Sequence, residues 1–595
     1  MARTRYKAGL GAIAIKDLPA AALRAVLREG YSSKDLKADV LAGLVVGIVA
    51  LPLAMALAIG VGVPPQHGLY TSIIAGFFVA ALGGSRTQVT GPTAAFIVIL
   101  APIYSKFGMA GLLMSGLMAG VMLVVMGLAR MGRLIEFIPH PVTSGFTAGI
   151  GTVIATLQLK DLLGLKLEHN PEHFFEKVGA MFAARATVSG WEVALGLATL
   201  AGLIYFPRIT RRAPAPLVVL PLAAVAAFAI NRAIPTAHIA TIASRFHSTI
   251  GDRAVSGIPQ LPPLPVLPWN MGGPEGASFH LGFESVRTLL SGAFAVAMLG
   301  AIESLLSAVV ADGMARTKHD PDAELLSLGV SNILVPFLGG IPATGAIART
   351  ATNIRSGARS PFAAMTHALT VLVAVLALAP LLGYLAMTSL AALLLLVAWN
   401  MSEIKHCIHT IRVAPKSDVA VLLTCYGLTV GFDMVVGVTV GMVLAAFLFM
   451  RRMADVTQAR LVGDGHPDLP GTVPPGVAVY EISGPLFFGA AQKAIAALEI
   501  VASDTKAVIL LLGEVNAMDS TGLVALESAL DMLLAHKCLA VVTGVRPQPM
   551  SVLRKAGLSQ RDGIAFCSTP AEALGLAKRF LASPPGERPS SAVVG

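Results

Sequence analysis

TGPTAAFIVILAP at 90–102 and GGIPATGAIARTATN at 339–353 are two short apolar segments that begin alike. Each opens with glycine, proline and threonine and then continues for about three helical turns, which is too short to span a bilayer. One is the third apolar segment of the first half of the chain, and the other is the third of the second half. Short, glycine- and proline-interrupted segments at corresponding places predict an inverted-repeat transporter whose site lies where they meet. The alternative is a pair of kinked helices that only pack.

The rest of the chain has the composition of a membrane protein. Of its 595 residues, 55% are hydrophobic and 13% are charged, and the mean hydropathy is +0.74. A soluble domain has about 25% charged residues. Residues 38–452 form one apolar block, in which polar turns separate about fourteen segments, several of them short. The sequence therefore predicts an all-α polytopic membrane domain at 38–452.

Basic residues near the ends of the apolar segments indicate the orientation of the chain. Pairs such as Arg130 with Arg133 and Arg451 with Arg452 fall on one side if the chain begins inside, and such residues concentrate in cytoplasmic loops. The pattern predicts a multi-pass protein of the bacterial inner membrane with both termini in the cytoplasm, the first segment being 1–37. It also accounts for the net charge of +10, so no nucleic-acid partner is expected.

The composition changes after Arg452. A polar stretch with glycine and proline predicts a linker at 453–476, and the residues after it predict a cytoplasmic α/β domain at 477–583, because short strand patterns alternate with helical ones. The helical patterns lie at 489–502, 521–536, 548–556 and 570–582. Residues 584–595 are rich in serine and proline and predict a disordered tail.

Catalytic and cofactor motifs do not stand out in the sequence. The four cysteines form no CxxC pair and have no histidine cluster beside them, which disfavours metal and disulfide interpretations. We find no nucleophile–base pair and no P-loop. The expectation is a protein that is not an enzyme and needs no cofactor or metal.

The two short segments favour an anion as substrate. A helix that starts inside the membrane leaves its first backbone N–H groups unpaired at a positive dipole end. Two such ends that face each other form a site for negative charge. The small residues Ala94, Ala95, Gly345 and Ala346 would let a substrate approach the backbone.

Two ionisable residues inside apolar segments are further candidates. Arg349 lies about one turn into the second short segment, at a depth where a charge costs several kcal/mol and is functional by default. It could hold a carboxylate, or it could only pair with Glu303 or a carbonyl. Glu303 is the acidic residue in the middle of SGAFAVAMLGAIESLLSAVVADG and could carry a coupling proton. Its alternative role is structural pairing.

Several motifs of the chain resemble those of a known transporter family. GVGVPPQHGLYT, GGSRTQVTGPTAAF, LGAIESLLSAVVADGM and GGIPATGAIART resemble the SulP anion transporters, and ISGPLFFGAA with MDSTGL resembles a STAS domain. The similarity runs from about residue 34 to 583. It implies fourteen spans in a 7+7 inverted repeat, divided into core and gate domains, and a homodimer. It also implies protons or sodium as the coupling ion at Glu303. The substrate-binding residues that it implies are Thr90, Gly91, Pro92, Thr93, Ala94, Ala95, Thr344, Gly345, Ala346, Ile347, Ala348 and Arg349.

Within the family, LPLAMALAIG and LVAWNMSE are most similar to bacterial C4-dicarboxylic acid transporters. The resemblance therefore implies proton-coupled uptake of succinate, fumarate or aspartate. Many sulfate-type members carry glutamine after the proline of the first span, whereas Leu53 follows Pro52 here, which argues against sulfate. The alternatives are a sulfate or bicarbonate transporter of the same fold, and a membrane-anchored STAS signalling protein.

One motif of the C-terminal domain is left. Asp519-Ser520-Thr521-Gly522 matches the turn that is phosphorylated in STAS domains of anti-sigma-factor antagonists. The helix dipole would tolerate a phosphate on Ser520 there. The alternative is that Ser520 simply caps the helix, with Asp519 as the other candidate. A cytoplasmic protein partner of the STAS domain is a further expectation, and the signalling alternative would require one.

Overall fold

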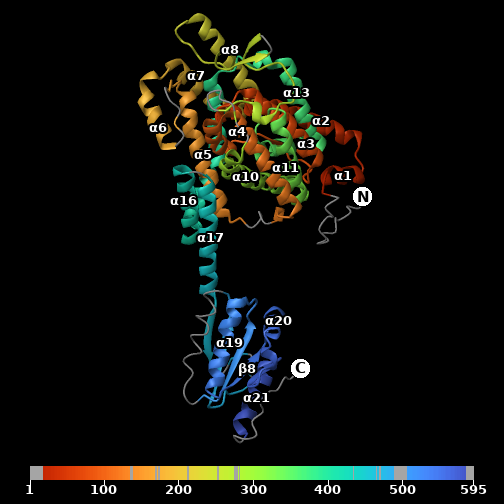
Figure 1. The fold of residues 1–595 in the computed structure, drawn as a ribbon, viewed down its shortest axis with the longest axis vertical. Coiled ribbons are helices and arrows are strands. Elements are labelled where there is room, and N and C mark those ends of the chain that lie inside the picture. The colour runs from red at the N-terminus through yellow and green to blue at the C-terminus, as the bar shows by residue number, and fades with distance from the viewer. Residues whose placement is uncertain are drawn as a thin grey trace. The chain divides into compact units, whose positions relative to one another are not determined.

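The computed structural model describes residues 18–133, 138–167, 171, 174–210, 214–250, 253–273, 279, 282–432, 434–463, 466–467, 469, 471–487 and 505–583. The chain divides into two compact units, Met1–Met442 and Val443–Gly595. Figure 1 shows that the first unit is helical and that the second combines helices with a sheet.

The first unit contains long apolar helices. Among the described residues, nine helices are long and apolar enough to cross a membrane. The helices up to residue 233 are α1 (Ala21–Glu29), α2 (Ser33–Val61), α3 (Pro65–Leu82), α4 (Ala95–Leu128), α5 (His140–Leu162), α6 (Phe174–Ala183), α7 (Gly190–Ile209) and α8 (Ala215–Ala233). Those that follow are α9 (Ile242–Arg245), α10 (Phe283–Ala315), α11 (Pro321–Phe337), α12 (Ile347–Arg355), α13 (Pro361–Leu382), α14 (Met387–Ser402), α15 (Ile404–Val413), α16 (Lys416–Gly431) and α17 (Met434–Val456).

A glycine divides α4 into two helices. Gly108 has φ 66° and ψ −164°, a backbone conformation that essentially only glycine adopts. With the two parts counted separately and α1, α6, α9 and α15 set aside, seven described helices precede residue 234 and seven follow residue 282. The polytopic helical fold that the sequence predicts is confirmed.

The helices pack in two groups. One group joins α2, α3, α4, α10, α11, α12 and α13, and the other joins α5, α7, α8, α14 and α16. Each group takes helices from both halves of the chain, as a fold of two repeats with a core and a gate domain requires. A β-hairpin, β2 (His247–Ile250) with β3 (Arg253–Ser256), precedes α10.

The second unit has a five-stranded sheet in the order β5-β6-β7-β8-β9. The strand β5 is antiparallel to β6, and the other neighbours are parallel. Both faces are covered, since α19 packs its apolar side chains on one face and α21 on the other. The elements are β5 (Gln458–Val462), β6 (Val477–Ser483), β7 (Ala507–Glu514), α19 (Ser520–Ala535), β8 (Leu539–Thr543), α20 (Pro547–Lys555), β9 (Ile564–Cys567) and α21 (Pro570–Ala582).

The stretch predicted as a linker is partly wrong. Residues 453–476 begin inside α17 and contain β5, which completes the edge of the sheet by pairing with β6. The side chains of Gln458–Val462 are exposed or half-buried. An exposed edge strand lacks the apolar run that predicts the buried strands β7 and β8. The helix expected at 489–502, the tail at 584–595 and residues 1–17 lie outside the described residues.

Candidate functional site

The two short segments meet as a pair of two-residue strands. The strand β1 (Thr90–Gly91) is antiparallel to β4 (Thr344–Gly345), with Thr90 opposite Gly345 and Gly91 opposite Thr344. The helices α4 and α12 begin just beyond these strands, at Ala95 and Ile347. Neither N-cap residue, Ala94 or Ala346, provides a side-chain cap. The Ile97 N–H of α4 donates to the Ala94 carbonyl, and the N–H groups of Ala95 and Phe96 in α4 and of the first turn of α12 remain available for a ligand.

Part of this region is accessible and part is buried. Ile347 and Ala348 are exposed, and Thr93 and Ala346 are half-buried. We call these four residues the accessible face. The strand residues behind it, with Pro92, Ala94 and Ala95, are buried. The residues predicted from the sequence are therefore brought together, although a substrate could touch only some of their side chains.

Glu303 lies beside the accessible face. Thr93 Oγ1 donates a hydrogen bond to Glu303 Oε2 over 2.9 Å. Glu303 comes from the middle of α10 and is 9% exposed. The carboxylate thus contacts the residue at which the first short segment meets the accessible face, where a proton on it would neutralise charge near a bound anion.

Arg349 is buried behind β1 rather than displayed on the accessible face. It is 2% exposed, and its guanidinium lies against Gly91 and Ser72, with 3.4 Å between Nη1 and Ser72 Oγ. Its Nε and Nη2 have no hydrogen-bond partner among the described residues. The alternative of a pair with Glu303 is not what the structure shows, because the guanidinium bonds to Ser72 Oγ and its other two nitrogens have no partner among the described residues.

His367 was missed by the sequence analysis. It lies on α13, is fully buried, and neither ring nitrogen has a hydrogen-bond partner among the described residues. A Cβ built on Gly76 would lie 3.2 Å from its Nδ1 and 3.4 Å from the Thr90 carbonyl oxygen. A buried imidazole therefore stands behind β1 near Arg349. A histidine within an apolar helix pattern carries no signal of its place, since core histidines look the same.

Hydrogen bonds from α10, α11 and α12 hold the strands in place. Thr344 Oγ1 donates to the Gly300 carbonyl over 2.6 Å, and the Val89 N–H donates to Thr350 Oγ1 over 3.0 Å. Asn332 bonds both the N–H and the carbonyl of Ala343, each at 2.9 Å. These side chains replace the longer sheet that would normally fix a strand of two residues.

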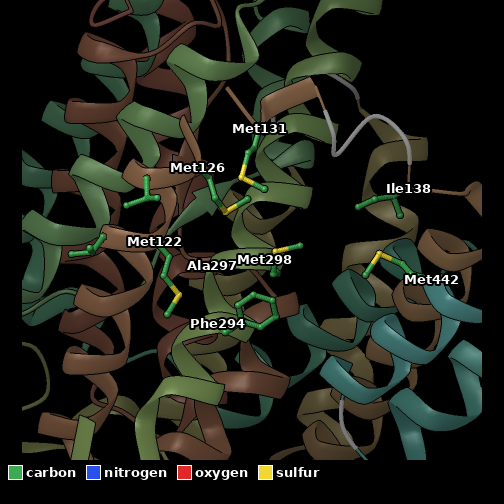
Figure 2. Close-up of a pocket in the computed structure, with 10 residues that line it drawn as sticks. Met122, Met126, Met131, Ile138, Phe294, Ala297, Met298 and Met442 are labelled. Carbon is green, nitrogen blue, oxygen red and sulfur yellow. The ribbon is translucent and has the colours of Figure 1, made fainter. Parts of the chain in front are cut away.

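An apolar cavity of about 450 Å³ lies apart from this site, between α4, α10, the chain before α5 and α17 (Figure 2). Its lining includes Met122, Met126, Met131, Met298 and Met442 and no charged residue. Methionine is flexible and adapts to irregular gaps. The side chains that line the cavity provide no charged group to bind an anion. The candidate substrate site is therefore the region around β1 and β4.

In the C-terminal unit, Asp519 and not Ser520 caps α19. Asp519 Oδ1 accepts from the Gly522 N–H at 2.7 Å, and Ser520 is the exposed first residue of the helix. Of the two candidates for a cap, the structure selects Asp519. Within the described residues, no group of three metal-binding side chains occurs, and Cys407, Cys425, Cys538 and Cys567 are buried free thiols.

Comparison with known proteins accounts for both parts of the chain. The family model described as the sulfate permease family matches residues 36–425, and the STAS domain model matches residues 470–573. YvdB of Bacillus subtilis (strain 168), which bears a provisional name as a sulfate transporter, is 37% identical over 536 residues, 90% of this chain and 96% of YvdB. The bicarbonate transporter BicA of Picosynechococcus sp. is 28% identical over 554 residues, 89% of this chain and 92% of BicA.

Solved structures agree with these matches. The structure of the murine Solute Carrier 26 family member A9 anion transporter in the inward-facing state has a TM-score of 0.81 and covers 97% of both chains at 17% identity. At this identity the likeness shows the fold alone. The fold is that of a helical membrane domain with a C-terminal STAS domain.

Proposed function

The chain belongs to the sulfate permease (SulP) family of anion transporters, and from this premise we propose that it carries a small oxyanion, sulfate or bicarbonate, by secondary transport coupled to protons at Glu303. The substrate would bind on the accessible face, between the first turns of α4 and α12. A membrane-anchored signalling protein would not need two short facing helices that form a transport site. Their presence disfavours the signalling alternative.

One observation supports the proposal above the others. Arg349 is a buried guanidinium with two unpartnered nitrogens and no acidic partner among the described residues. A buried charge without a partner is unfavourable by several kcal/mol. An anion bound on the other side of β1 would relieve that cost, because its charge interacts with Arg349 through protein of low dielectric.

A single buried cation favours a compact anion over a dicarboxylate. The far carboxylate of succinate would need a second positive group on the accessible face, but Thr93, Ala346, Ile347 and Ala348 are uncharged. The C4-dicarboxylate preference expected from the motifs also has no counterpart in the names of YvdB and BicA, which concern sulfate and bicarbonate. Dicarboxylate uptake therefore stands as the second candidate, supported only by motif similarity.

Coupling, placement and assembly complete the proposal. Glu303 would take up a proton with the anion, with sodium as the alternative coupling ion. Both termini would face the cytoplasm of a bacterium, the spans would cross its inner membrane, and the protein would form a homodimer. The STAS domain would regulate transport through a cytoplasmic partner that reads the surface around Ser520.

Uptake into proteoliposomes tests the substrate. Radiolabelled sulfate, bicarbonate and succinate are supplied outside, with and without an inward proton gradient. The proposal expects accumulation of sulfate or bicarbonate that depends on the gradient, and little succinate uptake. Gradient-driven succinate uptake that exceeds both would replace it by the dicarboxylate function. Binding without uptake of any of the three would favour the signalling alternative.

A further inference from the structure

A second buried carboxylate, Glu324 of α11, lies against the segment that leads into β1. Glu324 is 1% exposed. In the sequence DPDAELL it resembles an ordinary acidic residue in the first turn of a helix. Its Oε2 accepts hydrogen bonds from the N–H groups of Gly84 and Ser85, at 3.0 and 3.1 Å. These two residues open the segment that leads from α3 into β1.

The same carboxylate has a second connection toward the site. The Ser304 hydroxyl of α10 lies near Glu324, although Glu324 Oε1 has no hydrogen-bond partner among the described residues. The same hydroxyl accepts a hydrogen bond from Gln88 Nε2 at 2.8 Å. Ser304 directly follows Glu303 in the chain. Ser304 therefore stands between Glu324 and Gln88, the residue two places before β1.

Gln88 carries this connection to β4. Its amide lies so close to Gly345 that a Cβ there would collide with Nε2, and the same Cβ would approach the Ser304 Cα to 2.9 Å. Gly345 precedes Ala346, the N-cap of α12. Displacing Gln88 or Ser304 would therefore change how closely β4 sits on α10, and with it the direction of the first N–H groups of α12.

We propose that Glu324 is a positioning residue for anion binding, which holds β1 through Gly84 and Ser85 and β4 through Ser304 and Gln88. It does not touch the substrate. Its function is to fix the two strands so that the uncapped ends of α4 and α12 converge, since a misplacement of about 1 Å in such a site is costly. This inference rests on the proposed anion site.

Substitutions at Glu324 can distinguish a need for its acceptor oxygens from a need for its negative charge. Glu324→Gln keeps a carbonyl oxygen at the same reach for Gly84 and Ser85 and adds an amide that can donate to Ser304. Glu324→Asp keeps the charge but is one methylene shorter, so it loses the reach. A positioning role therefore predicts that the Glu324→Gln variant binds anion like the wild type and that the Glu324→Asp variant binds it more weakly. A role for the charge predicts the reverse order.

The experiment measures anion binding by the purified full-length protein as the shift of its thermal unfolding, titrated with sodium sulfate and with sodium bicarbonate. The unfolding temperature without anion reports folding separately. We expect the dissociation constant of Glu324→Gln to stay within about twofold of the wild type, and that of Glu324→Asp and Glu324→Ala to rise about tenfold. Ser327→Ala is the control, because this buried hydroxyl one turn along α11 donates, among the described residues, only to the Glu324 carbonyl, at 2.9 Å.

Gln88→Ala supplies the second arm. If Gln88 and Glu324 act along one path, the double variant binds anion no more weakly than Glu324→Ala alone. Equal affinity in all variants, stronger binding by Asp than by Gln, or full additivity with Gln88→Ala would overturn the inference. If Glu324→Ala does not fold, the anion affinities of Glu324→Gln and Glu324→Asp still test the inference. A wild type that responds to neither salt would overturn the proposed anion site itself, a result distinct from the three above.

Discussion

Thr93 Oγ1 and Glu303 Oε2 lie 2.9 Å apart, so the first short segment and the middle of α10 share a hydrogen bond at the accessible face. The donor is neutral and the acceptor can bind a proton, which makes this contact the place where proton binding and anion binding can influence each other.

Glu303→Gln is expected to abolish accumulation of anion against a gradient. Glutamine keeps the shape and still accepts from Thr93, but it cannot exchange a proton, so downhill exchange should survive. The measurement is uptake of labelled sulfate or bicarbonate into proteoliposomes with and without a proton gradient. The control is Glu192→Gln, a buried carboxylate of α7 that accepts from the Ala240 N–H at 3.0 Å. Undiminished accumulation by the Glu303 variant would make Glu303 structural.

Gly345→Ala is expected to impair anion binding strongly. A Cβ at this position would collide with the Gln88 amide and approach the Ser304 Cα to 2.9 Å, and relieving such overpacking typically costs about 1–3 kcal/mol. The matched control is Gly313→Ala on α10, where nothing lies within 4 Å of the added methyl. Anion-dependent thermal shifts should be lost in the first variant and kept in the second. Retained binding by Gly345→Ala would show that β4 tolerates displacement.

Removal of residues 457–595 is expected to leave the membrane unit folded and its anion preference unchanged. The boundary between the two compact units lies within α17, at Met442 and Val443, and the sheet has its own core on both faces. The rate of uptake should change, because regulation would reside in the removed part. Competition of labelled anion uptake by sulfate, bicarbonate and succinate checks this. A reordered preference would contradict a purely regulatory STAS domain.

The sequence was sufficient to predict the two short helices and the α/β domain. Glycine, proline and threonine at 90–93 and 339–345 interrupt apolar runs, and a membrane tolerates interrupted helices only where the freed backbone groups are buried in protein or line a cavity. The strands β7 and β8 were predicted because they are uninterrupted apolar runs, as in Ala507–Leu512, where every residue is buried. The strand β6 was predicted from its alternating pattern, and no pattern predicted β9.

Tertiary relationships were not predictable in the same way. Whether Arg349 faces the substrate or lies behind β1 depends on the packing of α3 against β1, which no local pattern encodes. Glu324, Ser304 and Gln88 come from three separate segments, and each is of a type that is ordinary in its local setting: a first-turn acid, a small helix residue and a polar residue in a turn. Their connection appears only when the segments are packed together.

Arg349→Ala is expected to weaken anion binding in proportion to the charge of the anion. The guanidinium is buried behind β1, so it acts through its field, and Coulomb energy scales with the product of the charges. If bicarbonate then loses about tenfold in affinity, sulfate should lose about a hundredfold. Succinate should lose an intermediate amount, because its second carboxylate lies farther from Arg349. Arg349→Lys retains the charge and should lose much less.

The same variant should unfold at a higher temperature than the wild type in anion-free buffer, because a buried charge without a partner is removed. Binding is followed by competition of each anion against labelled sulfate, and folding by thermal unfolding with and without anion. A succinate loss far above the sulfate loss would mean that Arg349 grips one carboxylate directly, and the dicarboxylate function would gain its first physical support. Equal losses for monovalent and divalent anions would mean that Arg349 shapes the site without supplying its field, and the observation on which the proposed function rests would lose its force.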